Sequence, residues 1–235
     1  AIEKGAKKII LGLGGSATND GGTGILSALG FQLIDESGNH LKATGENLLA
    51  IRKINWPSSV PQIEFEIACD VQNILYGQLG AAYIYAPQKG ANNDQVKLLD
   101  NGLKNLAAII KEQTGKDISA IPGSGAAGGI AAGLLPFFDV TMKKGIELIM
   151  EASEIVGKIS GADLLITGEG KIDDQSGEGK VVGSIAALAK KYGIPCVGFC
   201  GITALEETAI KKLGLKKIIV LQDATLTNKE AMNNA

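Results

Sequence analysis

Apolar runs and amphipathic stretches alternate along the chain, and each pattern predicts one type of element. Short, mostly apolar runs are typical of strands buried in a sheet. We expect strands at residues 9–11, 31–35, 63–69, 162–166, 195–199 and 217–221. Apolar residues at helical spacing predict helices at residues 25–29, 41–54, 122–135, 144–159, 180–191 and 205–213. Because strands alternate with helices, the predicted fold class is α/β, with largely parallel sheets and flanking helices.

The clearest helical pattern lies between Asn92 and Gly115. Asn92 or Asn93 can cap its start, and Gly115 ends it. Apolar residues recur at helical spacing along it, at Leu99, Leu103, Leu106 and Ile110. This segment is therefore expected to be a long helix with one apolar face.

A glycine-rich polar loop follows the first expected strand. Residues 12–22 contain five glycines, and glycine lets a backbone turn sharply and approach a ligand because it has no Cβ. Exposed N–H groups in such a loop form a seat for an anion. The loop also carries hydroxyl, amide and carboxylate groups, on Ser16, Thr18, Asn19 and Asp20. A turn between strand and helix that binds no ligand is the alternative interpretation.

Composition and charge exclude several classes of function. The chain has 32 glycines in 235 residues, about twice the usual frequency. A net charge of -2, the lack of a basic stripe and 4% aromatic residues argue against nucleic-acid binding. No apolar run is long enough for a transmembrane helix, so we expect no membrane insertion.

The three cysteines, at positions 69, 196 and 200, form no CxxC pair. Reduced thiols in a core are the expected state, which suits a cytoplasmic protein. The chain begins at Ala1 without a methionine, in what reads as the end of a helix. We therefore expect it to be a piece of a longer protein.

Two familiar phosphate-binding patterns can be tested on the sequence. No Gly-Lys pair is followed by Ser or Thr, so the chain has no P-loop. Gly12, Gly14 and Ala17 follow a strand in dinucleotide-binding spacing, with Asp35 at the end of the next strand. The helix that this pattern requires would contain residues 18–22, which form helices poorly. A Rossmann-type dehydrogenase is therefore the weaker alternative.

Four carboxylates lie at or near expected strand ends beside glycine loops: Asp20, Asp70, Glu169 and Asp173. Carboxylates in this setting suit Mg²⁺ and phosphate handling, and phosphoryl transfer also needs cationic groups and a base. The candidate cations are Lys89, Lys171 and Lys180. With His40 as the single histidine, a Ser-His-Asp relay or a histidine zinc site is not expected. Capping a helix or holding a loop is the alternative role for each acid.

Five sequence blocks combine glycines with polar and charged residues. They are residues 14–22, residues 68–71 with Asn73, residues 87–91, residues 125–129, and residues 167–170 with Asp173 and Gln175. Taken together, these blocks strongly resemble the bacterial (type I) glycerate kinase family: they occur in the family's order and cover the chain from Lys7 to Gly201.

The resemblance implies ATP-dependent phosphorylation of D-glycerate, with ATP and Mg²⁺, in a two-lobed α/β protein with its active site between the lobes. We assign catalytic roles to Asp70, Asp173 and Lys89, and either acid can serve as base or metal ligand. Metal binding is assigned to Asp70 and Glu169. The candidate cofactor-binding residues are Gly14, Gly15, Ser16, Asn19, Asp20, Gly125, Gly128, Thr167, Gly168, Glu169 and Gly170. The residues themselves leave packing as an equal alternative for Gly125 and Gly128.

The chain departs from the family at its N-terminus. Family members carry an additional N-terminal segment with a Pro-Asp-Ser-Phe-Lys-like stretch and an Ala-Asp-Gly-Gly-Glu-Gly-like loop, and neither occurs here. We expect an α/β lobe at residues 1–160 and a Rossmann-like portion at residues 161–235 that the absent segment completes. A nucleotide- or hydroxy-acid-binding fragment without turnover is therefore a second hypothesis, and a homodimer is the candidate assembly.

Overall fold

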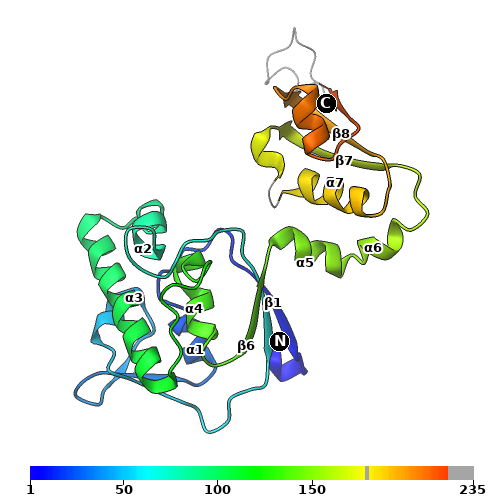
Figure 1. Ribbon diagram of the computed structural model, residues 1–235. Helices are drawn as coiled ribbons and strands as arrows, with labels where there is room; N and C mark the ends of the chain where they lie inside the picture. The colour runs from blue at the N-terminus through cyan, green and yellow to red at the C-terminus, as the bar shows by residue number, and fades with distance from the viewer. Residues whose placement is uncertain (178–179, 222–235) are drawn as a thin grey trace. The chain divides into compact units, whose positions relative to one another are not determined.

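The computed structural model describes residues 1–177 and 180–221. The chain divides into two compact units, unit 1 at residues 1–143 and unit 2 from residue 144 onward (Figure 1). The division falls at the end of strand β6 (Asp139–Lys143), where the chain leaves the sheet of unit 1. It precedes the expected boundary after residue 160, so helices α5 (Gly145–Ala152) and α6 (Ile155–Lys158) belong to unit 2.

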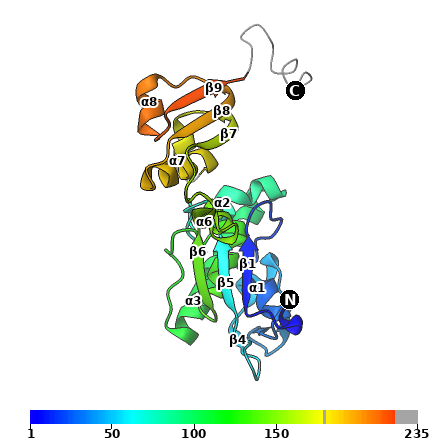
Figure 2. The ribbon, with the colours of Figure 1, turned by 90° about the vertical axis from the view of Figure 1, so that its right-hand side faces the viewer.

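A parallel sheet forms the centre of unit 1 (Figure 2). Strand β5 (Glu64–Ala68) lies between β1 (Lys8–Gly12) and β6, and the order is β1-β5-β6. The sequence pattern predicts β1 and β5, and both are present. It does not predict β6, because charged residues at both ends of this strand obscure its apolar alternation. The parallel α/β class is confirmed in this unit.

Helices α1 (Thr23–Ala28), α3 (Asn93–Thr114) and α4 (Ile130–Leu134) lie on one side of this sheet (Figure 1). Their apolar side chains form one core with Phe65 and Ile67 of β5. Helix α3 is confirmed at nearly its expected length. Asn92 and Gln95 form a capping box at its start, and Gly115 ends it in the left-handed conformation at φ +74°.

The expected helix at residues 41–54 is wrong. The chain there forms β3 (His40–Leu41), a 3₁₀ helix η2 (Gly45–Ala50) and β4 (Lys53–Asn55), and both strands pair antiparallel with β2 (Gln32–Ile34). Side chains of α3 stabilise this arrangement. Asn105 donates to the carbonyls of Leu48 and Ile51, each at 2.9 Å, and the Gln113 amide bonds both the N–H and the carbonyl of Ile54. These tertiary contacts outweigh the local helical spacing.

Unit 2 contains a second parallel sheet in the order β7-β8-β9, with bounds β7 (Leu165–Ile172), β8 (Cys196–Thr203) and β9 (Lys217–Val220). Its core joins Ile172 to Val182 and Ala186 of α7 (Val181–Lys191), and α8 (Glu207–Lys212) precedes β9. The expected single helix at 144–159 is wrong: it breaks between α5 and α6, where Glu154 adopts a left-handed backbone at φ +51°.

The central strand of unit 1 carries a nearly buried carboxylate. Glu66 is 7% exposed, and its Oε1 accepts hydrogen bonds from Lys8 at 2.9 Å and Lys143 at 3.1 Å. These bonds, from Lys8 first and Lys143 second, lower the pKa of Glu66. Because the folded pKa lies below the unfolded one, the stabilising contribution is present above about pH 5 and is lost as the pH falls through the folded pKa.

We therefore expect Glu66→Gln to reduce the acid sensitivity of unit 1. The urea midpoint of the wild type should fall more steeply between about pH 5 and about pH 3 than that of the variant. Glu36→Gln, at an exposed turn position, is the control and should follow the wild type. Parallel curves for wild type and Glu66→Gln would contradict the assigned role of this carboxylate.

Candidate active site

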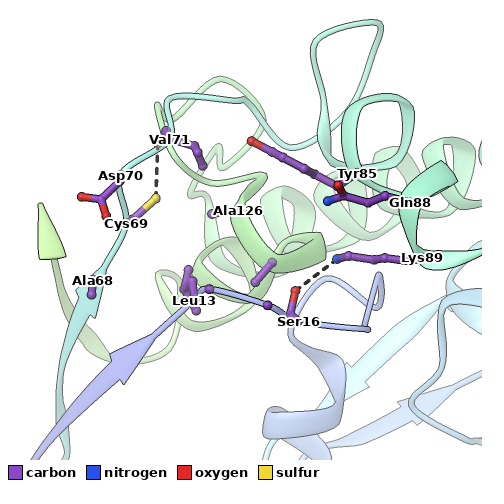
Figure 3. Close-up of a pocket in the computed structure, with 13 residues that line it drawn as sticks. Leu13, Ser16, Ala68, Cys69, Asp70, Val71, Tyr85, Gln88, Lys89 and Ala126 are labelled. Carbon is purple, nitrogen blue, oxygen red and sulfur yellow. Dashed lines mark hydrogen bonds between the residues drawn. The ribbon is translucent and has the colours of Figure 1, made fainter. Parts of the chain in front are cut away.

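A pocket of about 260 Å³ lies in unit 1 beside the carboxyl ends of β1 and β5 (Figure 3). Four segments line it: residues 13–16 after β1, residues 68–71 at the end of β5, Tyr85, Gln88 and Lys89 of α2 (Ala81–Tyr85) and η3 (Pro87–Lys89), and Ala126 and Ala127 of η4 (Ala126–Gly128). Loops at the carboxyl ends of parallel strands are where open α/β sheets bind ligands. The position of this pocket therefore suits a substrate site.

Gly14 and Gly15 form the open edge of the pocket. Both are exposed, and a Cβ atom at either position would meet no other atom within 4 Å. Gly15 also adopts a φ of +65°, which side chains rarely tolerate. The backbone here is thus exposed, and the cofactor-binding role of Gly14 and Gly15 stays a prediction.

Lys89 connects the glycine loop to η3. Its Nζ donates to Ser16 Oγ at 3.1 Å and to the carbonyl of Thr18 at 2.6 Å. Burial lowers the pKa of Lys89, and the nearby Asp20 carboxylate opposes that effect. Ser16 and Lys89 therefore place a hydroxyl and a partly desolvated ammonium side by side in the pocket (Figure 3).

Cys69 and Asp70 occupy successive positions after β5 and point to opposite sides. The Cys69 thiol is buried and donates to the carbonyl of Val71 at 3.3 Å, and burial raises its pKa. The Asp70 carboxylate lies at the rim and is turned away from Ser16 and Lys89 (Figure 3). This alternation is the normal consequence of an extended backbone. It leaves Asp70 as the exposed carboxylate of the pocket.

Tyr85 is a pocket residue that the sequence reasoning misses, and Gln88, which lies in the block of residues 87–91, was given no role there. The Tyr85 hydroxyl donates to Asn73 Oδ1 at 2.5 Å, and burial raises its pKa. A raised pKa keeps the phenol protonated at neutral pH, so Tyr85 does not act as a base. Tyr85 lies four residues before Lys89, which is the helical spacing that places two side chains on one face, and this signal was present in the sequence.

Asn19 and Asp20 lie behind the pocket. Asp20 accepts from the N–H groups of Gly22 at 3.0 Å and Gly24 at 2.9 Å, so its carboxylate holds the start of α1. Asn19 is 9% exposed, and its side-chain amide has no hydrogen-bond partner among the described residues. Neither residue lines the pocket, and their cofactor-binding role stays a prediction.

Gly125 and Gly128 are packed tightly against other backbone. A Cβ on Gly125 would overlap the carbonyl of Ile74, and one on Gly128 would overlap the carbonyl of Thr18. The carbonyl of Gly128 also accepts from the N–H of Gly21 at 2.9 Å. Neither position therefore has room for a side chain, and the cofactor-binding role of the two glycines stays a prediction.

A second polar cluster lies in unit 2 at the carboxyl end of β7. The fully buried Ser176 hydroxyl lies 3.4 Å from Glu169 Oε2 and 3.5 Å from Asp173 Oδ1, and it accepts from the N–H of Asp173 at 3.0 Å. Asp173 also pairs with Lys171 at 3.3 Å. Residues 167–170 belong to strand β7 and not to a loop: residues 167–169 pair with β8, and Gly170 lies within the same strand.

The other predicted residues of unit 2 lie along the same strand. Thr167 is 8% exposed, and its hydroxyl has no hydrogen-bond partner among the described residues. Gly168 approaches the carbonyl of Phe199 closely, whereas Gly170 leaves open space where a Cβ would lie. The side chain of Gln175, part of the same sequence block, lies outside what the structure describes, and so does the backbone of residues 178–179.

Metal binding is not directly visible in the described parts of the chain. Within residues 1–177 and 180–221, no three His, Cys, Asp or Glu side chains form a ready metal-ligand set. Asp70 lies in unit 1 and Glu169 in unit 2, so their joint metal role stays a prediction.

Among the helices of the described residues, none has both the length and the apolar character that crossing a membrane requires.

The dinucleotide-binding alternative is wrong. Helix α1 begins at Thr23, well beyond Ala17, so no helix N-terminus meets the glycines of that pattern. Asp35 follows β2, which belongs to a separate antiparallel sheet and does not pair with β1. The geometry that a bound dinucleotide requires is therefore missing at this loop.

The sequence of the chain also matches a known protein family. The model of the glycerate kinase family matches residues 1–235. The chain belongs to this family. A glycerate kinase from Halalkalibacterium halodurans is 40% identical over 99% of the chain, and a glycerate 2-kinase from Escherichia coli K12 is 39% identical over the whole chain. The chain spans about three fifths of the length of these relatives, 62% in both cases.

A solved structure extends the likeness to the fold. A crystal structure of a protein from Salmonella typhimurium LT2, assigned as a glycerate kinase 2, superposes with a TM-score of 0.82 at 36% sequence identity. The match covers 99% of this chain and 61% of that one. The α/β architecture and the resemblance found in the sequence are thus confirmed.

In this glycerate kinase family chain, the predicted site residues fall into three groups. One group lines the pocket of unit 1: Gly14, Gly15, Ser16, Asp70 and Lys89. A second group does not line the pocket but belongs to the adjoining loops: Asn19, Asp20, Gly125 and Gly128. The third lies on or after β7 of unit 2: Thr167, Gly168, Glu169, Gly170 and Asp173.

Proposed function

We propose that the protein containing this chain transfers a phosphoryl group from ATP to D-glycerate with the help of Mg²⁺. Membership of the glycerate kinase family carries this proposal, and the named activities of the bacterial relatives support it. The pocket of unit 1 adds an independent observation, because Ser16, Lys89 and Asp70 are all among the residues that line it. A three-carbon hydroxy acid needs donors for its carboxylate and an acceptor for its hydroxyl proton.

Each group in the pocket has an assigned task in this proposal. Asp70 serves as the base: its exposed side chain turns toward the bound substrate, and one of its carboxylate oxygens accepts the proton of the substrate hydroxyl. It is the acid that lines this pocket in the described chain, whereas Cys69 and Tyr85 have raised pKa values and stay protonated. The apolar walls from Leu13, Val71 and Ala126 help to exclude water.

The residues of unit 2 fit the nucleotide and its cation. Glu169 and Asp173 place two carboxylates around one buried hydroxyl, and paired carboxylate oxygens are the ligands that Mg²⁺ prefers. When bound, ATP supplies the phosphoryl group and Mg²⁺ offsets the charge of its phosphate oxygens. The buried hydroxyl of Thr167, which has no partner among the described residues, is a further candidate contact for the nucleotide.

The free state of the three cysteines supports a cytoplasmic location. A homodimer stays a prediction.

Acceptor-dependent ADP release tests this function. With Mg²⁺ and ATP, the 235-residue chain should form ADP when D-glycerate is added, and not when glycerol replaces it. Chelation of Mg²⁺ should stop the reaction. ADP formation at the same rate with and without D-glycerate would contradict the proposal. No ADP under any condition would favour the binding fragment without turnover.

A further inference from the structure

We propose that Lys89 and Ser16 bind the carboxylate of the hydroxy-acid substrate, and that this corner of the pocket does not hold the nucleotide phosphates. The inference rests on the proposed function and deepens it, because it gives each end of the substrate a place. The carboxylate lies against Lys89 and Ser16, whose polar groups lie side by side in the pocket (Figure 3), and the hydroxyl end of the substrate takes the rest of the cavity.

The hydrogen bonds of Lys89 leave capacity for a ligand. A lysine ammonium has three N–H donors. Among the described residues, Ser16 Oγ and the carbonyl of Thr18 are its hydrogen-bond partners, which leaves one donor. Ser16 Oγ accepts from Lys89, so its own proton stays available. Two donors whose heavy atoms lie 3.1 Å apart suit the two oxygens of one carboxylate.

The charge of the pocket favours a single anionic group. Lys89 is the cation and Asp70 the anion among the described residues that line it. The ammonium of Lys89 is half-buried and has lost part of its contact with water. An anionic ligand compensates for this loss by binding the ammonium directly. A triphosphate carries several charges and is better served by more than one cation.

The size of the pocket supports the same assignment. Pockets for drug-sized ligands enclose roughly 300–1,000 Å³. The cavity here holds about 260 Å³ and is walled by Leu13, Val71, Ala126 and Ala127. A three-carbon acid fits such a space, which is smaller than the usual pocket of a drug-sized ligand.

Calorimetric titration of the 235-residue chain tests this assignment. The wild type should bind D-glycerate about tenfold to a hundredfold more tightly than glycerol, which has the same carbon chain without the carboxylate. In Lys89→Met this preference should vanish, and the affinity for Mg-ATP should stay unchanged. Lys104→Met is the matched control, because it removes an exposed lysine of α3 in the same unit, and it should keep the preference for D-glycerate.

A second variant separates substrate binding from the structural role of Lys89, whose hydrogen bonds link the glycine loop to η3. Ser16→Ala keeps the bond from Lys89 to Thr18, so the loop stays tied, and D-glycerate binding should weaken severalfold. Lys89→Arg keeps the charge and should retain part of the preference for the acid. The inference is overturned if the wild type binds glycerol as well as D-glycerate, or if Lys89→Met loses affinity for Mg-ATP and keeps it for D-glycerate.

Failure of the inference can be told apart from failure of the proposed function. If Lys89 governs D-glycerate binding but the chain forms no ADP, the inference stands and the function is not performed by these residues alone. If ADP forms and Lys89→Met leaves the KM for D-glycerate unchanged, the function stands and the carboxylate binds elsewhere.

Discussion

Substitution of Asp70 by asparagine should lower kcat for glycerate phosphorylation by about a hundredfold to ten-thousandfold. The amide cannot accept the proton of the substrate hydroxyl, whereas its size keeps the pocket shape. The affinity for D-glycerate should change little, because the carboxylate of the substrate lies at Lys89 and Ser16. Steady-state kinetics of ADP release against D-glycerate concentration measures both quantities.

Asp173→Asn is the comparison that separates the two candidate acids. Asp173 and Glu169 lie around the same Ser176 hydroxyl, and two neighbouring carboxylates suit a metal-binding role. We expect this variant to need more Mg²⁺ and to recover most of its rate when Mg²⁺ is saturating. If Asp173→Asn stays inactive at saturating Mg²⁺ and Asp70→Asn stays active, the two acids have the opposite roles.

Replacement of Gly128 by alanine should lower the free energy of unfolding by about 3 kcal/mol. A left-handed backbone costs a residue with Cβ about 1–2 kcal/mol, and overpacking typically adds about 1–3 kcal/mol. Gly128 has a φ of +72°, and its Cβ would overlap the carbonyl of Thr18 and the Cα of Asn19. The substitution therefore pushes the glycine loop out of place.

Gly115→Ala is the matched control for this prediction. Gly115 has a nearly identical φ of +74°, but a Cβ there would meet nothing within 4 Å. Its cost should be about 1 kcal/mol, from the backbone conformation alone. Urea unfolding followed by the fluorescence of Trp56, the single tryptophan of the chain, reports on unit 1. Equal losses in the two variants would show that the close approach of Gly128 to the loop has no energetic weight.

The elements that local patterns determine are predictable from the sequence. Strand β5 and helix α3 follow their apolar spacing and their end residues, and both appear where expected. The error at residues 41–54 has a nonlocal cause, because Asn105 and Gln113 of a distant helix supply its hydrogen bonds. Likewise, β7 continues through Glu169 because strand β8, some thirty residues later, pairs with it.

The candidate site shows the same division. Glycines and charged residues beside strand ends mark Ser16, Asp70 and Lys89, and the structure places all three at one pocket. The sequence does not distinguish residues that face a ligand from residues that support a loop. Asp20 and Gly128 also lie in the sequence blocks of the family. Their contacts in the structure support the backbone, and only the packing of the folded chain reveals this.

Phosphorus NMR of the 235-residue chain with Mg-ATP and D-glycerate tests the central claim most directly. We expect a new phosphomonoester signal that grows as the ATP signals decline, and its proton coupling will identify the phosphorylated hydroxyl. Omission of D-glycerate should leave ATP intact. Conversion of ATP to ADP and inorganic phosphate, without a phosphomonoester, would contradict phosphoryl transfer to glycerate by this chain.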